Sequence, residues 1–210
     1  MKTSVIIPVK TFQKSKTRLQ LSQERTKELC RLLLDEVIRT VSESGLIDKI
    51  IVVTDEDQIS DIIKKYDCQK IQDKEESSVN NAVKLAEGYL IENEFTHSIV
   101  LPLDVPFFYS EDLEKLLKFS SEKSVVIVPS RHFDGTNALV RTPIDSMTPR
   151  YDEGSHSFQI ESAKNNDVKI SIGLIYRLML DIDSKEDLEF VLNQNIKPEF
   201  CEEIRKIIEK

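Results

Sequence analysis

The stretch SVIIPVKTFQKSKTRL, residues 4–19, passes from an apolar run directly into a row of cations. The apolar part, Ser4–Val9, lacks polar alternation, which indicates a buried strand covered on both faces by helices. In such α/β sheets ligands bind beyond the carboxyl ends of the strands. The cations that follow, with no acid among them, are therefore open to two interpretations, a solvated basic loop or a set of phosphate ligands. They are Lys10, Lys14, Lys16 and Arg18.

The rest of the chain repeats this pattern, with short apolar runs between longer segments of helical period. The alternation is typical of an α/β protein with a mainly parallel, Rossmann-like mixed sheet and helices on both faces. Strands are expected at Ser4–Val9, Lys49–Thr54, Gln69–Gln72, His97–Leu103, Ser124–Pro129, Thr136–Arg141 and Ile170–Tyr176. Helices are expected over 22–44 behind a Ser22 cap, over 78–93, over 155–165, after Ser184 and from Pro198 onward.

Composition and charge narrow the class of protein. With 210 residues, 40% of them hydrophobic and 31% charged, the chain is expected to form one domain over residues 1–210. The formal net charge of -8 argues against nucleic acid or an anionic membrane as the main partner. Three widely spaced cysteines show no metal or redox spacing, and no run approaches the roughly 18 apolar residues of a membrane span. We therefore expect a cytoplasmic protein with small-molecule partners.

Carboxylates follow two later apolar runs. Asp104 stands alone between two prolines in IVLPLDVPFF, and its burial is costly unless it is paired or binds a metal. Asp181 and Asp183 in LDIDSKEDL are two residues apart, so they project from the same side of an extended segment. By itself this acidic pair favours a helix cap, with Ser184 and Asp187 at the start of the next helix. Together with Asp104 it predicts a site for a hard divalent cation such as Mg²⁺.

The stretch PSRHFDGTNALVR suggests a further part of a site. Asp134 and Gly135 predict a hairpin turn, and Thr136 and Asn137 stand at the head of the strand that follows. That arrangement would leave the Thr136 hydroxyl and nearby N–H groups free for an anion. Cations at one strand end and carboxylates at others suit a metal-dependent transfer between phosphates.

These four stretches resemble the motifs of the 2-phospho-L-lactate guanylyltransferases of coenzyme F-420 biosynthesis, and the resemblance covers nearly the whole chain. IPVKTFQKSKTRL is similar to V-P-V-K…A-K-S-R-L, LPLDVPFF to L-P-A-D-L-P-L-L, DGTNALVR to G-G-T-N-A-L, and LDIDSKEDL to D-I-D-T-P-E-D-L. The resemblance implies a glycosyltransferase-A-like nucleotidyltransferase fold. It also implies a reaction in which GTP and a phosphorylated three-carbon acid, with 2-phospho-L-lactate as the first choice, give a guanylylated acid and pyrophosphate.

The resemblance also implies roles for individual residues. Lys16, Arg18 and Asp104 would be catalytic. The nucleotide would contact Lys10, Lys16, Arg18 and Asn80, the last from SVNNAV. Mg²⁺ would be held by Asp104, Asp181 and Asp183. The acceptor acid would face Thr136, Asn137, Gly154 and Ser155.

The match weakens in YDEGSHSFQ, residues 151–159, where the family has F/Y-G-x-x-S-F-x-x-H. Here Asp152 replaces a glycine, His156 an aromatic residue and Gln159 a histidine. These changes leave the acceptor open among phospholactate, phosphoenolpyruvate and phosphoglycerate. One hypothesis is that Asp152 or Gln159 binds the extra hydroxyl of phosphoglycerate, and a site built for that hydroxyl would reject an acid lacking it.

The expected mechanism is in-line attack of an acceptor phosphate oxygen on the α-phosphorus of GTP. No protein nucleophile or general base is needed, because a phosphate is already an anion, so catalysis consists of positioning and charge neutralisation. A related nucleotidyltransferase, a small sugar-nucleotide glycosyltransferase and a non-catalytic nucleotide-binding protein stay as alternatives. The sequence also leaves open the identity of the nucleotide and the oligomeric state, a homodimer included.

Overall fold

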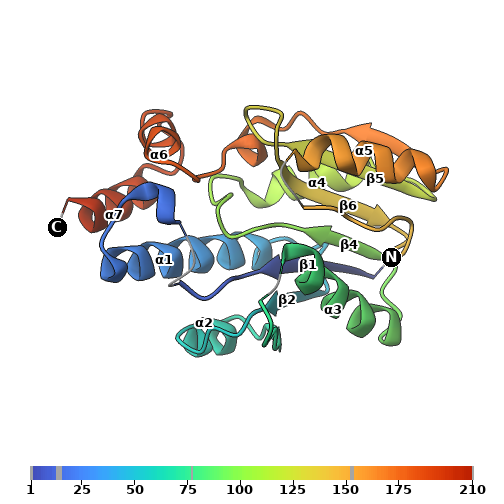
Figure 1. Cartoon of the computed structure of the whole chain (residues 1–210), viewed down its shortest axis with the longest axis horizontal. Helices are drawn as coiled ribbons and strands as arrows, with labels where there is room; N and C mark the ends of the chain where they lie inside the picture. Colours follow the sequence, from blue (N-terminus) through green and yellow to red (C-terminus); the bar gives the residue numbers. More distant parts are fainter. Residues whose placement is uncertain (1, 13–15, 77, 152–153, 210) are drawn as a thin grey trace.

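The computed structural model describes residues 2–12, 16–76, 78–151 and 154–209. Its strands form one mixed sheet in the order β3-β2-β1-β4-β6-β5-β7 (Figure 1). Strand β6 is antiparallel to its neighbours β4 and β5, whereas the other pairs are parallel. The expectation of a mainly parallel mixed sheet is confirmed. The strands are β1 (Thr3–Pro8), β2 (Lys49–Val53), β3 (Gln69–Ile71), β4 (His97–Val100), β5 (Ser124–Pro129), β6 (Thr136–Thr142) and β7 (Lys169–Ile172).

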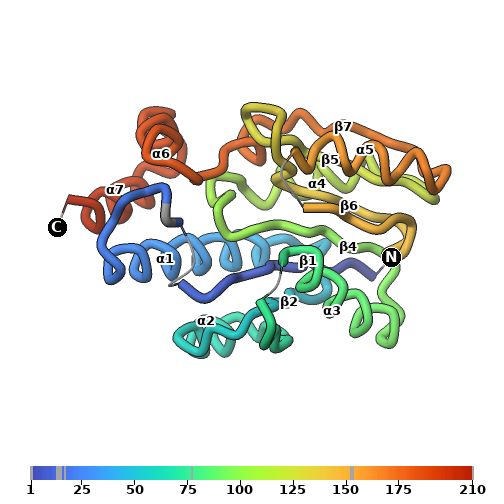
Figure 2. Tube along the Cα trace, in the orientation of Figure 1, coloured from blue at the N-terminus to red at the C-terminus, as the bar shows by residue number. Residues whose placement is uncertain are grey.

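Helices cover both faces of the sheet, as expected for strands without polar alternation. They are α1 (Gln23–Ser42), α2 (Ser60–Lys65), α3 (Val79–Glu92), α4 (Ser110–Lys118), α5 (Ser155–Asn165), α6 (Lys185–Leu192) and α7 (Pro198–Ile208). Buried residues of α1, α4, α6 and α7 share one apolar cluster, and those of α3 and α5 share the other. The tube in Figure 2 shows α7 lying against α1, with α6 beyond it at the same end of the molecule. No helix in the described ranges is long and apolar enough to cross a membrane.

The strand β1 shows why the two clusters lie on opposite faces. Successive side chains of a strand alternate in direction, so Val5 and Ile7 join the α1 cluster while Ile6 joins the α3 cluster. All three are fully buried. The apolar run that the sequence analysis interpreted as a central strand therefore forms the middle of both layers.

Two expected strands end more than one residue before their predicted ends. The strand expected at His97–Leu103 ends at Val100, because the chain turns out of the sheet at Pro102, which has no N–H to donate. The strand expected at Ile170–Tyr176 is Lys169–Ile172, and Tyr176 begins a short 3-10 helix instead. The segments that follow these two strands, which carry Asp104 and Asp181, therefore lie in loops at an edge of the sheet.

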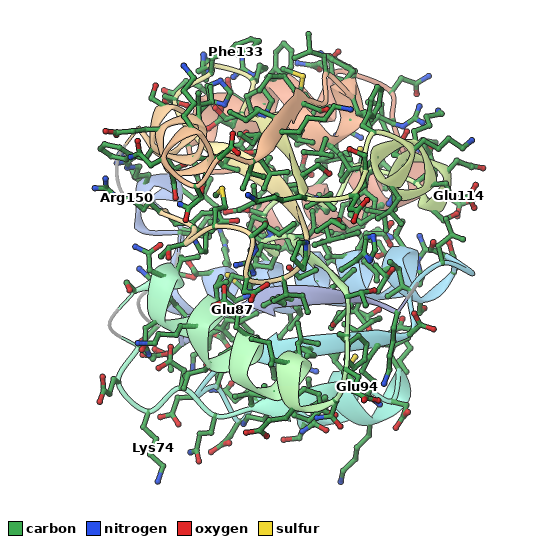
Figure 3. The ribbon with its side chains drawn as sticks, turned by 90° about the vertical axis from the view of Figure 1, so that its right-hand side faces the viewer. Lys74, Glu87, Glu94, Glu114, Phe133 and Arg150 are labelled. Carbon is green, nitrogen blue, oxygen red and sulfur yellow. The ribbon has the colours of Figure 1, made fainter. Side chains whose placement is uncertain are left out.

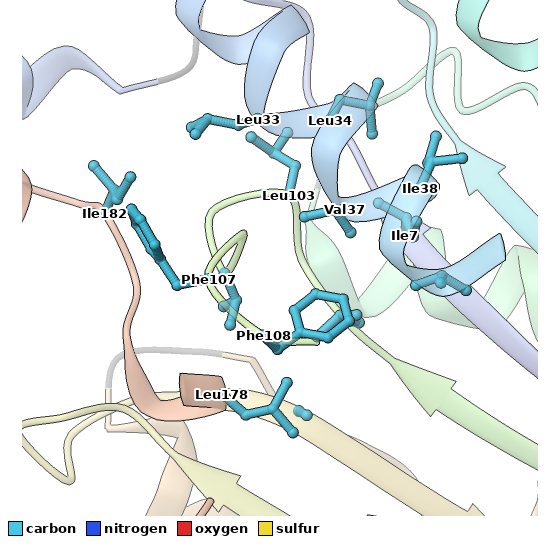
Figure 4. Packing of buried hydrophobic residues seen from close by; sticks show 14 of the residues in the cluster. Ile7, Leu33, Leu34, Val37, Ile38, Leu103, Phe107, Phe108, Leu178 and Ile182 are labelled. Atoms are coloured by element: carbon cyan, nitrogen blue, oxygen red, sulfur yellow. The ribbon is translucent and has the colours of Figure 1, made fainter. Parts of the chain in front are cut away.

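The loop after β4 is anchored by aromatic residues. Phe107 and Phe108 are fully buried and pack, as Figure 4 shows, near Leu103 and the α1 residues Leu33 and Val37. The same cluster includes Ile182. This packing holds Asp104 in a rigid position between Leu103 and Phe107.

Two predicted helix caps are confirmed. Ser22 accepts a hydrogen bond from the Arg25 N–H at the start of α1. Ser184 and Asp187 form a capping box at the start of α6, in which the hydroxyl accepts from Asp187 N and the carboxylate accepts from Ser184 N. Asp187 is therefore a capping residue.

Candidate functional site

A cleft of about 670 Å³ opens at the carboxyl ends of the parallel strands. Its walls come from the loops after β1 and β4, the β5–β6 hairpin, the segment between β6 and α5 (residues 143–154, called the β6–α5 loop) and the segment before α6. The cleft therefore brings together most of the residues that the sequence analysis singled out. Those lining it are Arg18, Asp104, Thr136, Asn137, Gly154, Ser155, Asp181 and Asp183.

The side chain of Lys16 reaches two of the cleft carboxylates. Its Nζ lies 2.7 Å from Asp104 Oδ2 and 2.8 Å from Asp183 Oδ1, and its side chain is only 7% exposed. Burial by itself would lower the pKa of Lys16, but the two carboxylates outweigh that effect and raise it. The ammonium therefore stays charged and bridges the segment after β4 to the segment before α6.

Three carboxylates meet at this edge, and burial disfavours the charged forms of two of them, Asp104 and Asp181. Burial raises the pKa of Asp104, although Lys16 partly opposes the shift. Burial also raises the pKa of Asp181 to about 6, while the Asn137 amide, which donates to Asp181 Oδ1 at 3.1 Å, partly opposes the shift. The backbone joins the two segments as well, since the Ile182 N–H donates to the Asp104 carbonyl at 3.0 Å. Additional positive charge would stabilise this group.

The carboxylates of the cleft provide oxygen donors for the expected Mg²⁺. Carboxylate oxygens are the ligands that this cation prefers, and one or two of them suffice when phosphate oxygens and waters complete the octahedron. Among the described residues, however, no three His, Cys, Asp or Glu side chains are arranged as a metal site. The physical reason is that the Lys16 ammonium lies between Asp104 and Asp183. The oxygen donors fit a divalent cation chemically, and in this arrangement the lysine provides the positive charge.

The other predicted cations are distributed along the loop after β1. Arg18, in the 3-10 helix Thr17–Leu19, is exposed and lines both the cleft and an adjoining hollow of about 450 Å³. Lys10 does not line the cleft. It lines a separate depression, called the α3 hollow, between the ends of β1 and β2 and the start of α3. Lys14 lies outside the described residues. The α3 hollow is lined by Pro8, Val9, Lys10, Val53, Asp73, Glu76, Ser78, Val79 and Ala82.

The expected acceptor residues lie together at the start of α5. The Ser155 hydroxyl donates to Thr136 Oγ1 at 3.1 Å, and both side chains are buried. Gly154 precedes the helix with φ 76°, a left-handed conformation that a larger side chain would strain. The N–H of Gly135 is not free as expected, because it donates to Ser130 Oγ at 3.0 Å.

Two side chains, one from α3 and one from α5, hold the β6–α5 loop. The N–H of Tyr151 donates to Asn80 Oδ1 at 2.7 Å, so Asn80 connects α3 to this loop. Gln159 is fully buried, and its amide accepts from Arg150 N and donates to Arg150 O at 3.2 and 2.9 Å. Figure 3 shows Arg150 at the outer edge of the molecule, where its guanidinium lies over Phe158.

The expectation that Gln159 could bind an acceptor hydroxyl is therefore wrong. Both polar atoms of its side chain already serve the backbone of Arg150, and no surface of the residue is exposed. Asp152, the other residue named in that hypothesis, lies outside the described residues. His156 packs edge-on against Phe133, and burial lowers its pKa. Arg131 pairs with Asp187 at 2.8 Å.

Sequence reasoning missed Asp73 and Glu76, two carboxylates at the α3 hollow. Asp73 is 5% exposed and lies two residues after β3, so the rule that identified Asp104, a carboxylate shortly after a strand, would also have found it. Glu76 accepts from the backbone N–H and the hydroxyl of Thr11. It thereby ties the loop after β1 to the loop before α3.

Comparisons with known proteins agree with this geometry. A family model described as "Guanylyl transferase CofC like" matches residues 3–207. A 2-phospho-L-lactate guanylyltransferase of Methanocaldococcus jannaschii is 31% identical over 191 residues, 90% of this chain and 81% of the relative. A phosphoenolpyruvate guanylyltransferase of Conexibacter woesei is 30% identical over 193 residues, with 90% and 86% covered. A 3-phospho-D-glycerate guanylyltransferase of Colwellia psychrerythraea is 29% identical over 195 residues, with 91% of each chain covered.

Solved structures resemble the fold. A nucleotidyl transferase from Methanothermobacter superposes with a TM-score of 0.69 at 11% identity, covering 96% of this chain and 98% of that one. A nucleotide-diphospho-sugar transferase from Desulfovibrio desulfuricans superposes with a TM-score of 0.77 at 14% identity, covering 100% and 98%. The expected nucleotidyltransferase-type α/β fold is confirmed.

Proposed function

This chain belongs to the CofC-like guanylyl transferase family, and from that premise we propose that it transfers GMP from GTP to the phosphate of 2-phospho-L-lactate, releasing pyrophosphate. The observation that carries the proposal is the cleft in which Arg18, Lys16 and three carboxylates meet the Thr136–Ser155 pair. Charged groups for a phosphate reaction thus lie beside hydroxyl groups for an acceptor. The product would enter coenzyme F-420 biosynthesis, in the cytoplasm.

The chain's own side chains account for most of the chemistry. An acceptor phosphate is an anion at neutral pH, so no residue is needed as a general base. Lys16 and Arg18 would neutralise the triphosphate, and Arg18 can donate two hydrogen bonds at once. Mg²⁺, held by Asp104, Asp181 and Asp183, would supply further charge neutralisation at the reacting oxygens. Lys16, which lies between Asp104 and Asp183, is placed to bind a phosphate oxygen that enters the cleft.

Acceptor binding would depend on the start of α5. Helix N-termini bind anions through their free N–H groups, and α5 begins at Ser155 beside the Thr136 hydroxyl. Relatives in the same family are named for three different acids, so phosphoenolpyruvate and phosphoglycerate are the acceptors to compare with phospholactate. Because Gln159 binds the Arg150 backbone, the case for phosphoglycerate now depends on Asp152 alone. A homodimer and a single domain over residues 1–210 stay predictions.

The test is an assay of purified protein with Mg²⁺, each of four ribonucleoside triphosphates and each of the three acids. Products are identified by mass spectrometry, and pyrophosphate release is measured in parallel. We expect a guanylylated phospholactate. Turnover of nucleotide sugars would support the glycosyltransferase alternative instead. Nucleotide binding without pyrophosphate release for any acid would support a non-catalytic protein and overturn the proposal.

A further inference from the structure

The α3 hollow lies beside the cleft and shares a loop with it. The loop after β1 passes from Lys10, which lines the hollow, to Arg18, which lines the cleft. A nucleotide whose phosphates lie at Arg18 can therefore place its base toward Lys10. The proposed function assigns residues to the triphosphate of the nucleotide, but it assigns none to the base.

The α3 hollow is small, about 30 Å³, and has mostly apolar walls against which a flat aromatic ring could stack. Its sides are mostly aliphatic, with Pro8 and Val9 from the end of β1, Val53 from β2, and Val79 and Ala82 from α3. Ligand pockets of this kind combine apolar walls with a few fixed polar groups that provide specificity. The polar groups come from the loop before α3 and the first turn of that helix, together with Lys10.

Asp73 is the buried polar group of this hollow. Two hydrogen bonds to one of its carboxylate oxygens fix the orientation of the side chain. This oxygen, Oδ1, accepts from Glu76 N at 3.2 Å and from Asn81 Nδ2 at 3.0 Å. Across the described parts of the chain, Oδ2 has no hydrogen-bond partner. The residue is 5% exposed. Because this oxygen of a largely buried side chain carries no protein donor, it is a ready acceptor for a ligand at the hollow.

We propose that Asp73 selects guanine by accepting hydrogen bonds from its N1–H and its 2-amino group. An ionised carboxylate only accepts hydrogen bonds. Guanine presents two donors side by side at this edge. Adenine and cytosine place a lone pair next to their amino group, and uracil flanks its single N–H with carbonyl oxygens. The carboxylate therefore attracts guanine and repels the corresponding edges of the other bases.

This inference rests on the proposed function, because it requires a nucleotide triphosphate as substrate. Asp73→Asn provides the sharpest test. The asparagine keeps an oxygen for Glu76 N and Asn81, so the local backbone is expected to hold. Its other side-chain atom becomes a donor, which repels the guanine amino group and matches the 2-carbonyl of xanthine. We expect the ratio of kcat/KM for XTP over GTP to rise by about 100-fold or more, because the variant loses a hydrogen bond to GTP and gains one to XTP.

The matched control is Asp57→Asn, the same chemical change at a carboxylate that is 92% exposed and lies outside the hollow. Its preference for GTP over XTP should equal that of the wild type. Circular dichroism and thermal unfolding of both variants verify that they fold. An unchanged XTP to GTP ratio in folded Asp73→Asn would overturn the inference.

A second measurement needs no variant. ITP lacks only the 2-amino group, so the wild-type kcat/KM for ITP should be about 10-fold or more below that for GTP, the effect of one hydrogen bond to a charged acceptor. Equal use of ITP and GTP would also overturn the assignment. If the wild type uses neither GTP nor ITP, the proposed function has failed. If it uses both equally, the proposed function survives and only Asp73 is misassigned.

Discussion

The ammonium of Lys16 and the carboxylates of Asp104 and Asp183 form the centre of the cleft. Lys16 has φ 53°, a backbone conformation that costs free energy in residues other than glycine. Removing one charge of this group leaves the remaining charges unbalanced at the place where a charged substrate would bind. Single substitutions here are therefore expected to have large effects on turnover.

Asp104→Asn should abolish turnover and leave the fold intact. The change removes a carboxylate charge that we propose binds Mg²⁺, without altering volume, and the Asp104 carbonyl still accepts from Ile182 N. We expect kcat at saturating Mg²⁺ to fall more than tenfold, a loss of at least about 1.4 kcal/mol of transition-state stabilisation. Circular dichroism reports on the fold, and Asp57→Asn serves as the exposed control. Activity above about a tenth of wild type would remove Asp104 from the metal site.

Arg18→Ala should weaken the use of GTP and leave the apparent affinity for the acceptor nearly unchanged. Among the described residues Arg18 has no hydrogen bond or ion pair, so it can bind a ligand without losing a structural contact. Loss of its charge-assisted bonds should raise the KM for GTP by about 10- to 100-fold. Steady-state kinetics with each substrate varied in turn measure this, with Arg25→Ala as an arginine control outside the cleft. A rise in the acceptor constant alone would show that Arg18 binds the other substrate.

At the scale of elements, the β6–α5 loop is held between two helices. Asn80 in the first turn of α3 accepts from Tyr151 N, and Gln159 in α5 binds both backbone groups of Arg150. The resemblance implied a place for Asn80 near the nucleotide. The observed hydrogen bond instead predicts that Asn80 positions the loop that the acceptor would contact.

Asn80→Ala should therefore raise the KM for the acceptor by about tenfold while changing the KM for GTP much less. The Tyr151 N–H would lose its partner, and an unsatisfied donor of this kind costs about 1–3 kcal/mol. Asn93→Ala, at the other end of α3, is the matched control because its side-chain amide donates to Tyr89 O of the same helix. A selective rise in the KM for GTP would favour direct contact with the nucleotide instead.

At the scale of the whole molecule, Lys197 joins three segments that are distant in the chain. Its Nζ donates to the Glu36 carboxylate and Thr40 Oγ1 on α1, and to the Pro106 carbonyl in the loop that carries Asp104. Lys197 itself begins α7 with φ 50°. The buried Glu36–Lys197 pair thus fixes the first and last long helices against the loop beneath the cleft.

Glu36→Gln should destabilise the protein by about 3 kcal/mol at neutral pH, because it leaves the buried Lys197 without its counter-charge. Burial alone raises the pKa of Glu36, but its bonds to Arg39 and Lys197 outweigh burial and lower it from its ordinary value of 4.5. A carboxylate with a lowered pKa contributes stability above that ordinary value and loses it as the pH falls. The difference between wild type and variant should therefore shrink below about pH 4.5.

Urea unfolding at pH 7 and pH 4 measures both effects. Glu43→Gln is the control, since Glu43 is half-exposed and its pair with Arg39 lies on the helix surface. Such exposed pairs contribute about 0.5 kcal/mol or less. An unfolding free energy for Glu36→Gln equal to that of the control at pH 7 would contradict the structural role of the pair.

Local signals in the chain were enough to predict much of this architecture. The strands β1 and β5, the caps Ser22 and Ser184 and the start of α5 at Ser155 all lie where the residue pattern placed them, within one residue. Each of these features depends on neighbours a few positions away, so its physical cause is contained in a short segment. The short helices α2 and α4 were missed, and neither begins with a side-chain cap such as Ser22.

Contacts between distant segments were decided by packing alone. The sequence placed cations after β1 and carboxylates after later strands, but only the folded chain brings Lys16 to Asp104 and Asp183 while Lys10 faces the α3 hollow. In the same way, the sequence suggested that Gln159 could bind a ligand, but in the folded chain its amide is hydrogen-bonded to the backbone of Arg150. The partners of a buried polar group are whichever donors and acceptors the packed elements bring within hydrogen-bond reach. That choice depends on the relative position of whole strands and helices, which no short stretch of sequence contains.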